Sequence, residues 1–176
     1  MTYYSNKDLA RSFRTVRANT MELANDIPEE QYEFRATPET RTVAAVLKHV
    51  AAGSRWQLKF HGEQRPSVTM EDFGGYMREA ADYEATLVTK ADIVNALELN
   101  GEQFATWVDS IGESTLAEVV AFPPPIQPPT KSRFEMILGV KEHEMHHRGQ
   151  LMVMQRLLGI VPHLTRAREA RVAAQR

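Results

Sequence analysis

The long helical pattern between residues 131 and 158 constrains the fold of this chain more than any other segment. Thr130 is suited to cap its start, and Gly159 is suited to end it. One row of side chains recurs along the pattern at alternating steps of four and three residues: Met136, Val140, His143, His147, Gln150, Met154 and Leu157 or Leu158. Such a repeat is typical of a helix that faces the centre of a helix bundle. We therefore expect an all-α fold organised around this helix.

Two histidines occupy the middle of this row. His143 and His147 are four residues apart, so their rings project from one face of the helix and both can reach one metal ion. An unpaired buried polar group costs about 1 to 3 kcal/mol, and a shared ion would satisfy one nitrogen of each ring. Two core histidines satisfied by hydrogen bonds are the alternative. His146 points to a different side of the helix and is expected at an edge.

Four further helical patterns precede the long one, and turn residues separate them. They cover residues 6–26, 38–61, 70–89 and 90–111. Thr37 and Pro38 form a typical start for the second of these helices, because threonine caps well and proline suits the first helical position. On the first helix, Arg11, Arg14 and Arg17 are expected to form the solvated side.

A third ligand is required for a catalytic metal site, which usually holds three protein ligands and keeps one position open. The chain has no cysteine, so His, Asp or Glu must supply that ligand. His49 is the best candidate, because it lies beside the apolar stripe of the predicted helix 38–61. His61 and His163 stand at helix ends and are less suitable.

The segment from residue 114 to residue 130 interrupts the helical rhythm. A short apolar run up to Phe122 favours an extended segment, and the PPPIQPP sequence that follows excludes a helix interior. We expect a stiff proline-rich crossover between bundle helices. A surface that binds an adaptor partner is the alternative. After a short helical continuation, residues 165–176 are predicted to form a frayed or partner-packed, arginine-rich tail.

Length and composition predict one domain covering residues 1–176. Of the 176 residues, 43% are hydrophobic and 25% are charged, which is ordinary for a single globular core. The formal net charge is -2, and both signs are mixed along the chain, so nothing favours nucleic acid or an anionic membrane as a partner. No apolar run has the length of a membrane span or of a signal-peptide core. We therefore expect a cytoplasmic protein.

Two motifs together resemble a known family. The first is H-x-x-x-H-R-G-Q-L, from His143 to Leu151, and the second is VLKHVAAGSRW around His49. Together with the L-x-G-I-x-P-H segment around Gly159, they resemble the DinB/YfiT-like superfamily of small helical metal-binding proteins, the DinB family. The resemblance covers nearly the whole chain.

The resemblance implies an up-down-down-up four-helix bundle, to which this chain adds a short helix and the proline-rich crossover. It also implies one divalent ion, nickel or zinc, held by His49, His143 and His147, and a homodimer. The superfamily includes thiol-dependent transferases and isomerases. The implied function is therefore a metal-dependent thiol S-transferase or isomerase that acts on a small electrophile, with a low-molecular-weight thiol as co-substrate.

Two neighbours of the histidines are candidates for supporting roles. Gln150 could orient an imidazole or bind a ligand, or it could be a buried polar spacer. Glu144 could support the site from behind or be solvated, but it also completes an H-E-x-x-H motif of zinc hydrolases. The extended peptidase pattern fails at Val153, where it requires histidine. A non-catalytic, metal-stabilised bundle or interaction protein is the other alternative.

Overall fold

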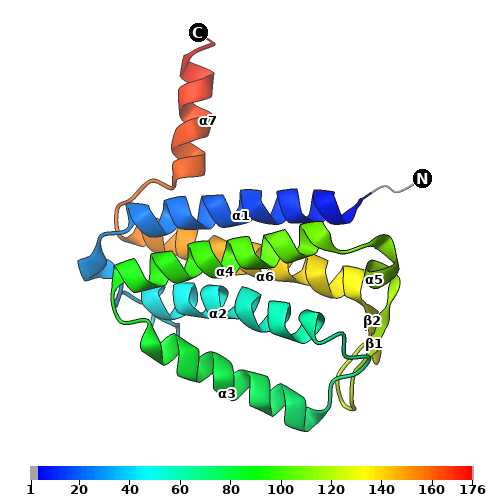
Figure 1. Cartoon of the computed structure of the whole chain (residues 1–176). Coiled ribbons are helices and arrows are strands. Elements are labelled where there is room, and N and C mark those ends of the chain that lie inside the picture. Colours follow the sequence, from blue (N-terminus) through cyan, green and yellow to red (C-terminus); the bar gives the residue numbers. More distant parts are fainter. Residues whose placement is uncertain (1–3, 176) are drawn as a thin grey trace.

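The computed structural model describes residues 4–175, and its core is a bundle of four long helices (Figure 1). These are α1 (Asn6–Asp26), α2 (Val43–Gly62), α4 (Lys90–Ser110) and α6 (Arg133–Leu157). Helices α1 and α2 do not pair with each other, and each packs against both α4 and α6. Each helix begins after a hydroxyl side chain that accepts a backbone hydrogen bond: Ser5, Thr42, Thr89 and Ser132. The predicted all-α fold is confirmed.

Helices α1 and α6 run in one direction, and α2 and α4 run in the other (Figure 1). Side-chain contacts agree with this order. Asn6 at the start of α1 donates to the carbonyl of Asp109 near the end of α4, at 2.8 Å. His61 near the end of α2 meets Arg133 at the start of α6, at 3.1 Å. The four helices are therefore arranged up, down, down and up.

The bundle core is divided by a polar layer. One apolar cluster lies at the end where α1 finishes, and it includes Leu23, Ile27, Leu47, Ile93, Leu97 and Leu151. The other lies at the end where α1 begins, and it includes Leu9, Phe13, Phe104, Val108 and Ile137. On each helix at least one buried polar residue falls between the two clusters in sequence, and these residues include Arg17, Ser54, Asn100 and Glu144. The middle of the bundle is thus polar and separates two apolar clusters.

Helix α3 (Met70–Thr86) lies outside the four-helix core and packs on α2 (Figure 1). It carries the chain from the end of α2 back to the start of α4. Phe60, Val68, Tyr76 and Val120 form a third, smaller apolar cluster where α2, α3 and the following hairpin meet. Three large apolar side chains of α3 stay exposed, at 41% to 53% of their surface: Met70, Phe73 and Met77.

The connection from α4 to α6 contains α5 (Glu113–Ala117) and a small hairpin of β1 (Val119–Ala121) and β2 (Thr130–Ser132). The strands are antiparallel, with Val119 opposite Ser132. The proline stretch, residues 123–129, is the loop of this hairpin, because Phe122 donates its backbone N–H to the carbonyl of Pro129 at 2.8 Å. The prolines thus lie in the connection between two bundle helices, where a stiff crossover was predicted, and they reverse the chain within that connection.

Several helix boundaries differ from the sequence prediction. Helix α6 begins at Arg133 and its cap is Ser132, so the prediction that Thr130 caps this helix was wrong, because Thr130 lies in β2. Helix α2 begins at Val43, because the Thr42 side chain caps the N–H of Ala45, whereas Thr37 and Thr40 close a separate turn upstream. At the other end, most of the predicted frayed tail is helix α7 (His163–Ala173), which extends away from the bundle (Figure 1). The last residue of that predicted tail lies outside the described residues. No helix within residues 4–175 is long and apolar enough to cross a membrane.

Candidate metal centre

The structure brings His49, His143 and His147 together between two antiparallel helices. His49 projects from α2, and the other two project from successive turns of α6. The Nε2 atom of His143 lies 3.3 Å from Nε2 of His49 and 3.1 Å from Nε2 of His147. One nitrogen from each ring lies within 4.8 Å of the others. The three residues predicted as ligands thus form one cluster.

The spacing of these nitrogens fits a shared ion. Nitrogen ligands bind zinc at about 2.0 to 2.1 Å, so two of them on a tetrahedral ion stand about 3.3 Å apart. Three imidazoles with no ion between them would place lone pairs against each other or require a proton in each gap. Imidazole suits zinc and nickel alike. The donor set and its spacing therefore fit a divalent transition-metal ion, without deciding which one.

Gln150 holds the ring of His147 from the side opposite the cluster. The Nδ1 atom of His147 lies 2.9 Å from Oε1 of Gln150, so Nδ1–H donates to the amide oxygen and Nε2 keeps its lone pair for the cluster. The amide nitrogen of Gln150 in turn donates to Nε2 of His146, at 3.1 Å. Gln150 is exposed and is not a buried spacer. His146 lies at the edge, as predicted.

Glu84 faces the back of His49 and was not predicted from the sequence as part of the site. Its Oε1 atom lies 3.5 Å from Nδ1 of His49, and both side chains are about three-quarters buried. A carboxylate behind a histidine ligand fixes the ring orientation and directs the other nitrogen toward the metal. Glu84 projects from α3, and nothing in the sequence paired that helix with His49.

Burial favours the neutral form of the two histidines on α6. It lowers the pKa of His143 to about 4, and the nearby His147 and His49 rings contribute further to that decrease. Burial also lowers the pKa of His147, against the opposing effect of its hydrogen bond to Gln150. Arg41 adds positive charge near both rings. Neutral imidazoles have free lone pairs, so His143 and His147 are ready to bind a cation at neutral pH.

The cluster stands between two cavities. A cavity of about 370 Å³ adjoins His49 and His143, and most of its wall is apolar: Trp56, Phe73, Met77, Phe122, Met136 and Val140. A second cavity, of about 420 Å³, adjoins His147 and Gln150 and also contains Arg41. Arg41 forms no ion pair within residues 4–175. An ion at the histidines would thus lie between a mainly apolar cavity, which also includes Lys131 and Glu135, and a second cavity whose one charged residue is Arg41.

Glu144 points away from the histidines and into the polar layer of the core. It is 2% exposed and accepts hydrogen bonds from Nε and Nη2 of Arg17, both at 2.9 Å. Arg17 is 5% exposed, so its prediction as a solvated residue was wrong. A hydrolase of the H-E-x-x-H type needs its glutamate beside the metal. Glu144 is instead held by Arg17, and it forms no hydrogen bond with the three histidines.

The heptad row predicted for α6 is displaced from the true centre of the bundle. Glu144 and Leu151 are buried, whereas His143 and Gln150 of the predicted row are exposed. The reason is that α6 packs against α1 as well as α2, so its buried face turns toward both helices. The histidines consequently lie at the α2–α6 edge, where a ligand can reach them.

The two histidines judged less suitable as ligands lie elsewhere. His61 is fully buried, stacks on Trp107 and accepts a hydrogen bond at Nδ1 from Arg133. Its pKa falls to about 3, because it is buried and next to the arginine cation. His163 at the start of α7 lies 3.1 Å from the side-chain oxygen of Asn19. Neither belongs to the three-histidine cluster.

The fold and the cluster together define a small all-α protein with a three-histidine site between antiparallel bundle helices. Comparison with known sequences agrees, because the family described as the DinB superfamily matches residues 12–151. The chain therefore belongs to the DinB superfamily. A search of curated protein sequences finds no match.

Solved structures of similar fold include other members of this family. A DinB-like protein of Bacillus subtilis, YjoA, has a TM-score of 0.64 and 18% identity, covering 86% of this chain and 92% of its own. A putative DinB-family member of Exiguobacterium sibiricum has a TM-score of 0.64 and 21% identity, covering 90% and 94%. A protein called sibling lethal factor precursor, DfsB, has a TM-score of 0.63 and 14% identity, covering 91% and 100%. At these identities the likeness shows the fold alone.

Proposed function

We propose that this protein is a metal-dependent thiol S-transferase. It would join a small thiol, through its sulfur atom, to an apolar electrophile at the three-histidine cluster. The observation that carries the proposal is the convergence of three histidine Nε2 atoms, with neighbours 3.1 and 3.3 Å apart, between two cavities. A structural zinc site is closed by four protein ligands, whereas a catalytic site has three and keeps one position open. Within residues 4–175 the cluster has three.

A bound nickel or zinc ion would lower the pKa of a coordinated thiol and present its sulfur as a nucleophile. The chain's own residues hold the imidazoles for this purpose. Gln150 fixes His147 through Nδ1, and Glu84 faces Nδ1 of His49. Both contacts leave Nε2 free to act as the ligand atom, which is the usual arrangement around a metal-binding histidine.

The two cavities suit two different substrates. The cavity beside His143 has Phe73, Met77 and Met136 in its wall, which would bind an apolar electrophile and exclude water from it. This proposal explains why Phe73 and Met77 of α3 are partly exposed, because they would contact the electrophile. The cavity beside His147 contains the cation of Arg41, which would pair with a carboxylate on the thiol. The sulfur and the electrophilic carbon would then meet at the histidines.

The test is a conjugation assay on metal-loaded protein. The thiols are cysteine and cysteamine, which differ only by a carboxylate, and the electrophile is 1-chloro-2,4-dinitrobenzene. In the reaction a sulfur–carbon bond forms, the carbon–chlorine bond breaks, and chloride and the thiol proton leave. We expect metal-dependent conjugation that is faster with cysteine, and we expect Arg41→Gln to remove that preference. His143→Ala should reduce the rate to the background rate.

Two results would contradict the proposal. Conjugation at the same rate by wild type and His143→Ala would place the reaction away from the cluster. Stoichiometric metal in wild type, with no conjugation of any thiol in a broad panel of electrophiles, would favour the non-catalytic alternative, in which the ion serves the fold.

A further inference from the structure

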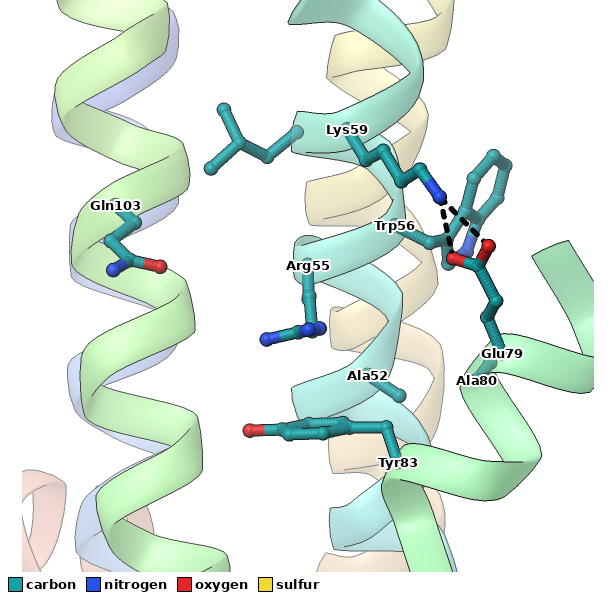
Figure 2. A pocket seen from close by; sticks show the side chains of 9 residues that line it. Ala52, Arg55, Trp56, Lys59, Glu79, Ala80, Tyr83 and Gln103 are labelled. Atoms are coloured by element: carbon teal, nitrogen blue, oxygen red, sulfur yellow. Dashed lines mark hydrogen bonds and ion pairs between the residues drawn. The ribbon is translucent and has the colours of Figure 1, made fainter.

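A pocket without histidines lies between α2, α3 and α4 (Figure 2). Its volume is about 450 Å³, within the usual range for small-molecule sites. Its walls come from nine residues: Ala52, Arg55, Trp56, Leu58, Lys59, Glu79, Ala80, Tyr83 and Gln103. Only Trp56 is shared with the cavities at the histidine cluster.

A cation without an acidic partner lies in this pocket. The guanidinium of Arg55 stacks on the ring of Tyr83, 4.6 Å from its centroid. In the described part of the chain, Arg55 forms no ion pair. The other two charges of the pocket cancel, because Lys59 is bonded to Glu79 at 2.7 and 2.8 Å (Figure 2). The pocket therefore carries one uncompensated positive charge.

Tyr83, which is itself held by Asn100, fixes the position of the Arg55 side chain. The hydroxyl of Tyr83 accepts a hydrogen bond of 2.9 Å from the side-chain amide of Asn100, which is 2% exposed and also donates to the carbonyl of Ala51. The tyrosine ring is thus anchored in the buried polar layer, and it holds the guanidinium by a cation–π contact. Figure 2 shows Arg55 above this ring and pointing toward α4, where Gln103 faces it. An arginine held in this way loses little rotamer freedom when it binds an anion.

The rest of the wall is apolar. Ala52, Leu58 and Ala80 present only carbon atoms to the pocket, and Trp56 adds an indole ring. Guanidinium groups bind carboxylates through two parallel hydrogen bonds. A matching ligand therefore has one carboxylate and an apolar body, which is flat if it is to lie against these rings. We propose that this pocket binds a small organic monoanion of that kind, with Arg55 as the partner of its carboxylate.

The test compares two probes that differ in charge. Calorimetric titration of the full chain with 2-naphthoate and with the neutral 2-naphthalenemethanol measures the preference for the anion. We expect the carboxylate to bind about tenfold tighter or more, which is the usual gain from one charged hydrogen-bonded pair. Arg55→Gln should remove this preference. Arg78→Gln is the matched control, because Arg78 is an exposed arginine of α3 outside the pocket, and it should keep the preference.

Two more variants locate the site. Ala80→Trp should fill the pocket and abolish the binding of both probes, while circular dichroism remains that of the wild type. His143→Ala should leave naphthoate binding unchanged, because the pocket contains no metal ligand. The proposal is overturned if the two probes bind equally, if Arg55→Gln keeps the preference, or if His143→Ala removes it. None of these outcomes depends on thiol transfer, so failure here and failure of the proposed enzyme activity are distinguishable.

Discussion

Helix α6 carries two polar clusters that begin at adjacent residues and have opposite character. On the side facing α1, Glu144 is paired with Arg17 and both are buried. On the side facing α2, His143 and His147 meet His49. In the first cluster, opposite charges satisfy each other. In the second cluster, three imidazole rings direct nitrogen lone pairs toward one point, and a cation bound there would satisfy all three.

The buried ion pair is satisfied by the chain itself. Glu144 accepts from two nitrogens of Arg17, and the remaining nitrogen donates to the carbonyl of Leu97. Gly101 makes space for the guanidinium, because a side-chain carbon there would stand 2.5 Å from Nη1 of Arg17. The difference between the clusters gives a way to separate structural from functional polar residues in this protein. Polar groups whose partners lie within the protein stabilise the fold, whereas polar groups without such partners are candidates for binding a ligand.

The largest expected effect concerns the ion pair. Arg17→Met should lower the free energy of unfolding by about 3 to 5 kcal/mol, because it leaves the buried carboxylate of Glu144 without its partner. Urea denaturation measures this loss. Arg14→Met is the matched control, since Arg14 pairs with Glu102 at the surface and such a pair contributes about 1 kcal/mol or less. The double variant Arg17→Met/Glu144→Leu should recover most of the loss. A loss no larger than in the control would show that the core cluster does not hold the fold.

A second buried pair, His61 and Arg133, sharpens the comparison, because it combines an imidazole with a guanidinium. The pKa of His61 is about 3 in the folded protein, against an ordinary value near 6.5. Between these values the unfolded chain binds more protons, so stability falls as the pH is lowered from 6.5 toward 3. Through His61 alone, the free energy of unfolding should be roughly 2 to 3 kcal/mol lower at pH 4.5 than at pH 7.

The variant His61→Gln tests that assignment. Glutamine keeps an acceptor for Arg133 but does not titrate, so the plot of unfolding free energy against pH should become flatter between pH 6.5 and 4.5. Chemical denaturation at a series of pH values gives the slope. An unchanged slope would mean that the acid sensitivity arises elsewhere, for instance at the histidine cluster.

A smaller effect is expected at the residue that orients His147. Gln150→Leu removes the acceptor of the Nδ1–H group and should weaken metal binding by about 10- to 100-fold. Competition with a chelator of known affinity measures the change. The stability of the metal-free protein should hardly change, because Gln150 is exposed. Equal metal affinity in the two proteins would show that this hydrogen bond does not prepare the site.

The smallest expected effect is at Glu84. Its carboxylate stands 3.5 Å from Nδ1 of His49, a long contact, so Glu84→Gln should weaken metal binding by less than about tenfold. Glu79→Gln on the same helix is the control, because Glu79 pairs with Lys59 and not with a metal ligand. A larger loss in Glu84→Gln than in Gln150→Leu would reverse the proposed order of the two orienting contacts.

The sequence predicted the histidine cluster better than its surroundings. The spacing of His143 and His147 depends only on one helix, and His49 was identified by its place beside the apolar stripe of its own helix and by the family resemblance. The partner of Glu144 could not be predicted in this way, because periodicity shows which face of a helix is buried but not which helix covers it. Arg17 lies 127 positions away and pairs only because α1 and α6 are neighbours.

The same reason explains the other differences. Glu84 reaches His49 because α3 returns along α2. Arg41 lies near the histidines because α2 begins at Val43, which leaves residue 41 in the segment before the helix. The number and approximate extent of the long helices followed from caps and apolar spacing, which are local. The hairpin around the prolines depends on strand pairing between residues on either side of them, which the apolar run alone did not reveal.

The measurement that tests the central claim most directly is the stoichiometry of zinc and nickel binding in wild type, His143→Ala and His163→Ala. His163 is the matched control, a partly buried histidine that contacts Asn19 and no other imidazole. We predict one ion per chain in wild type and His163→Ala, and none in His143→Ala, with the metal-free form of each variant folded. Equal metal binding in wild type and His143→Ala would contradict the claim that the three histidines form a metal site.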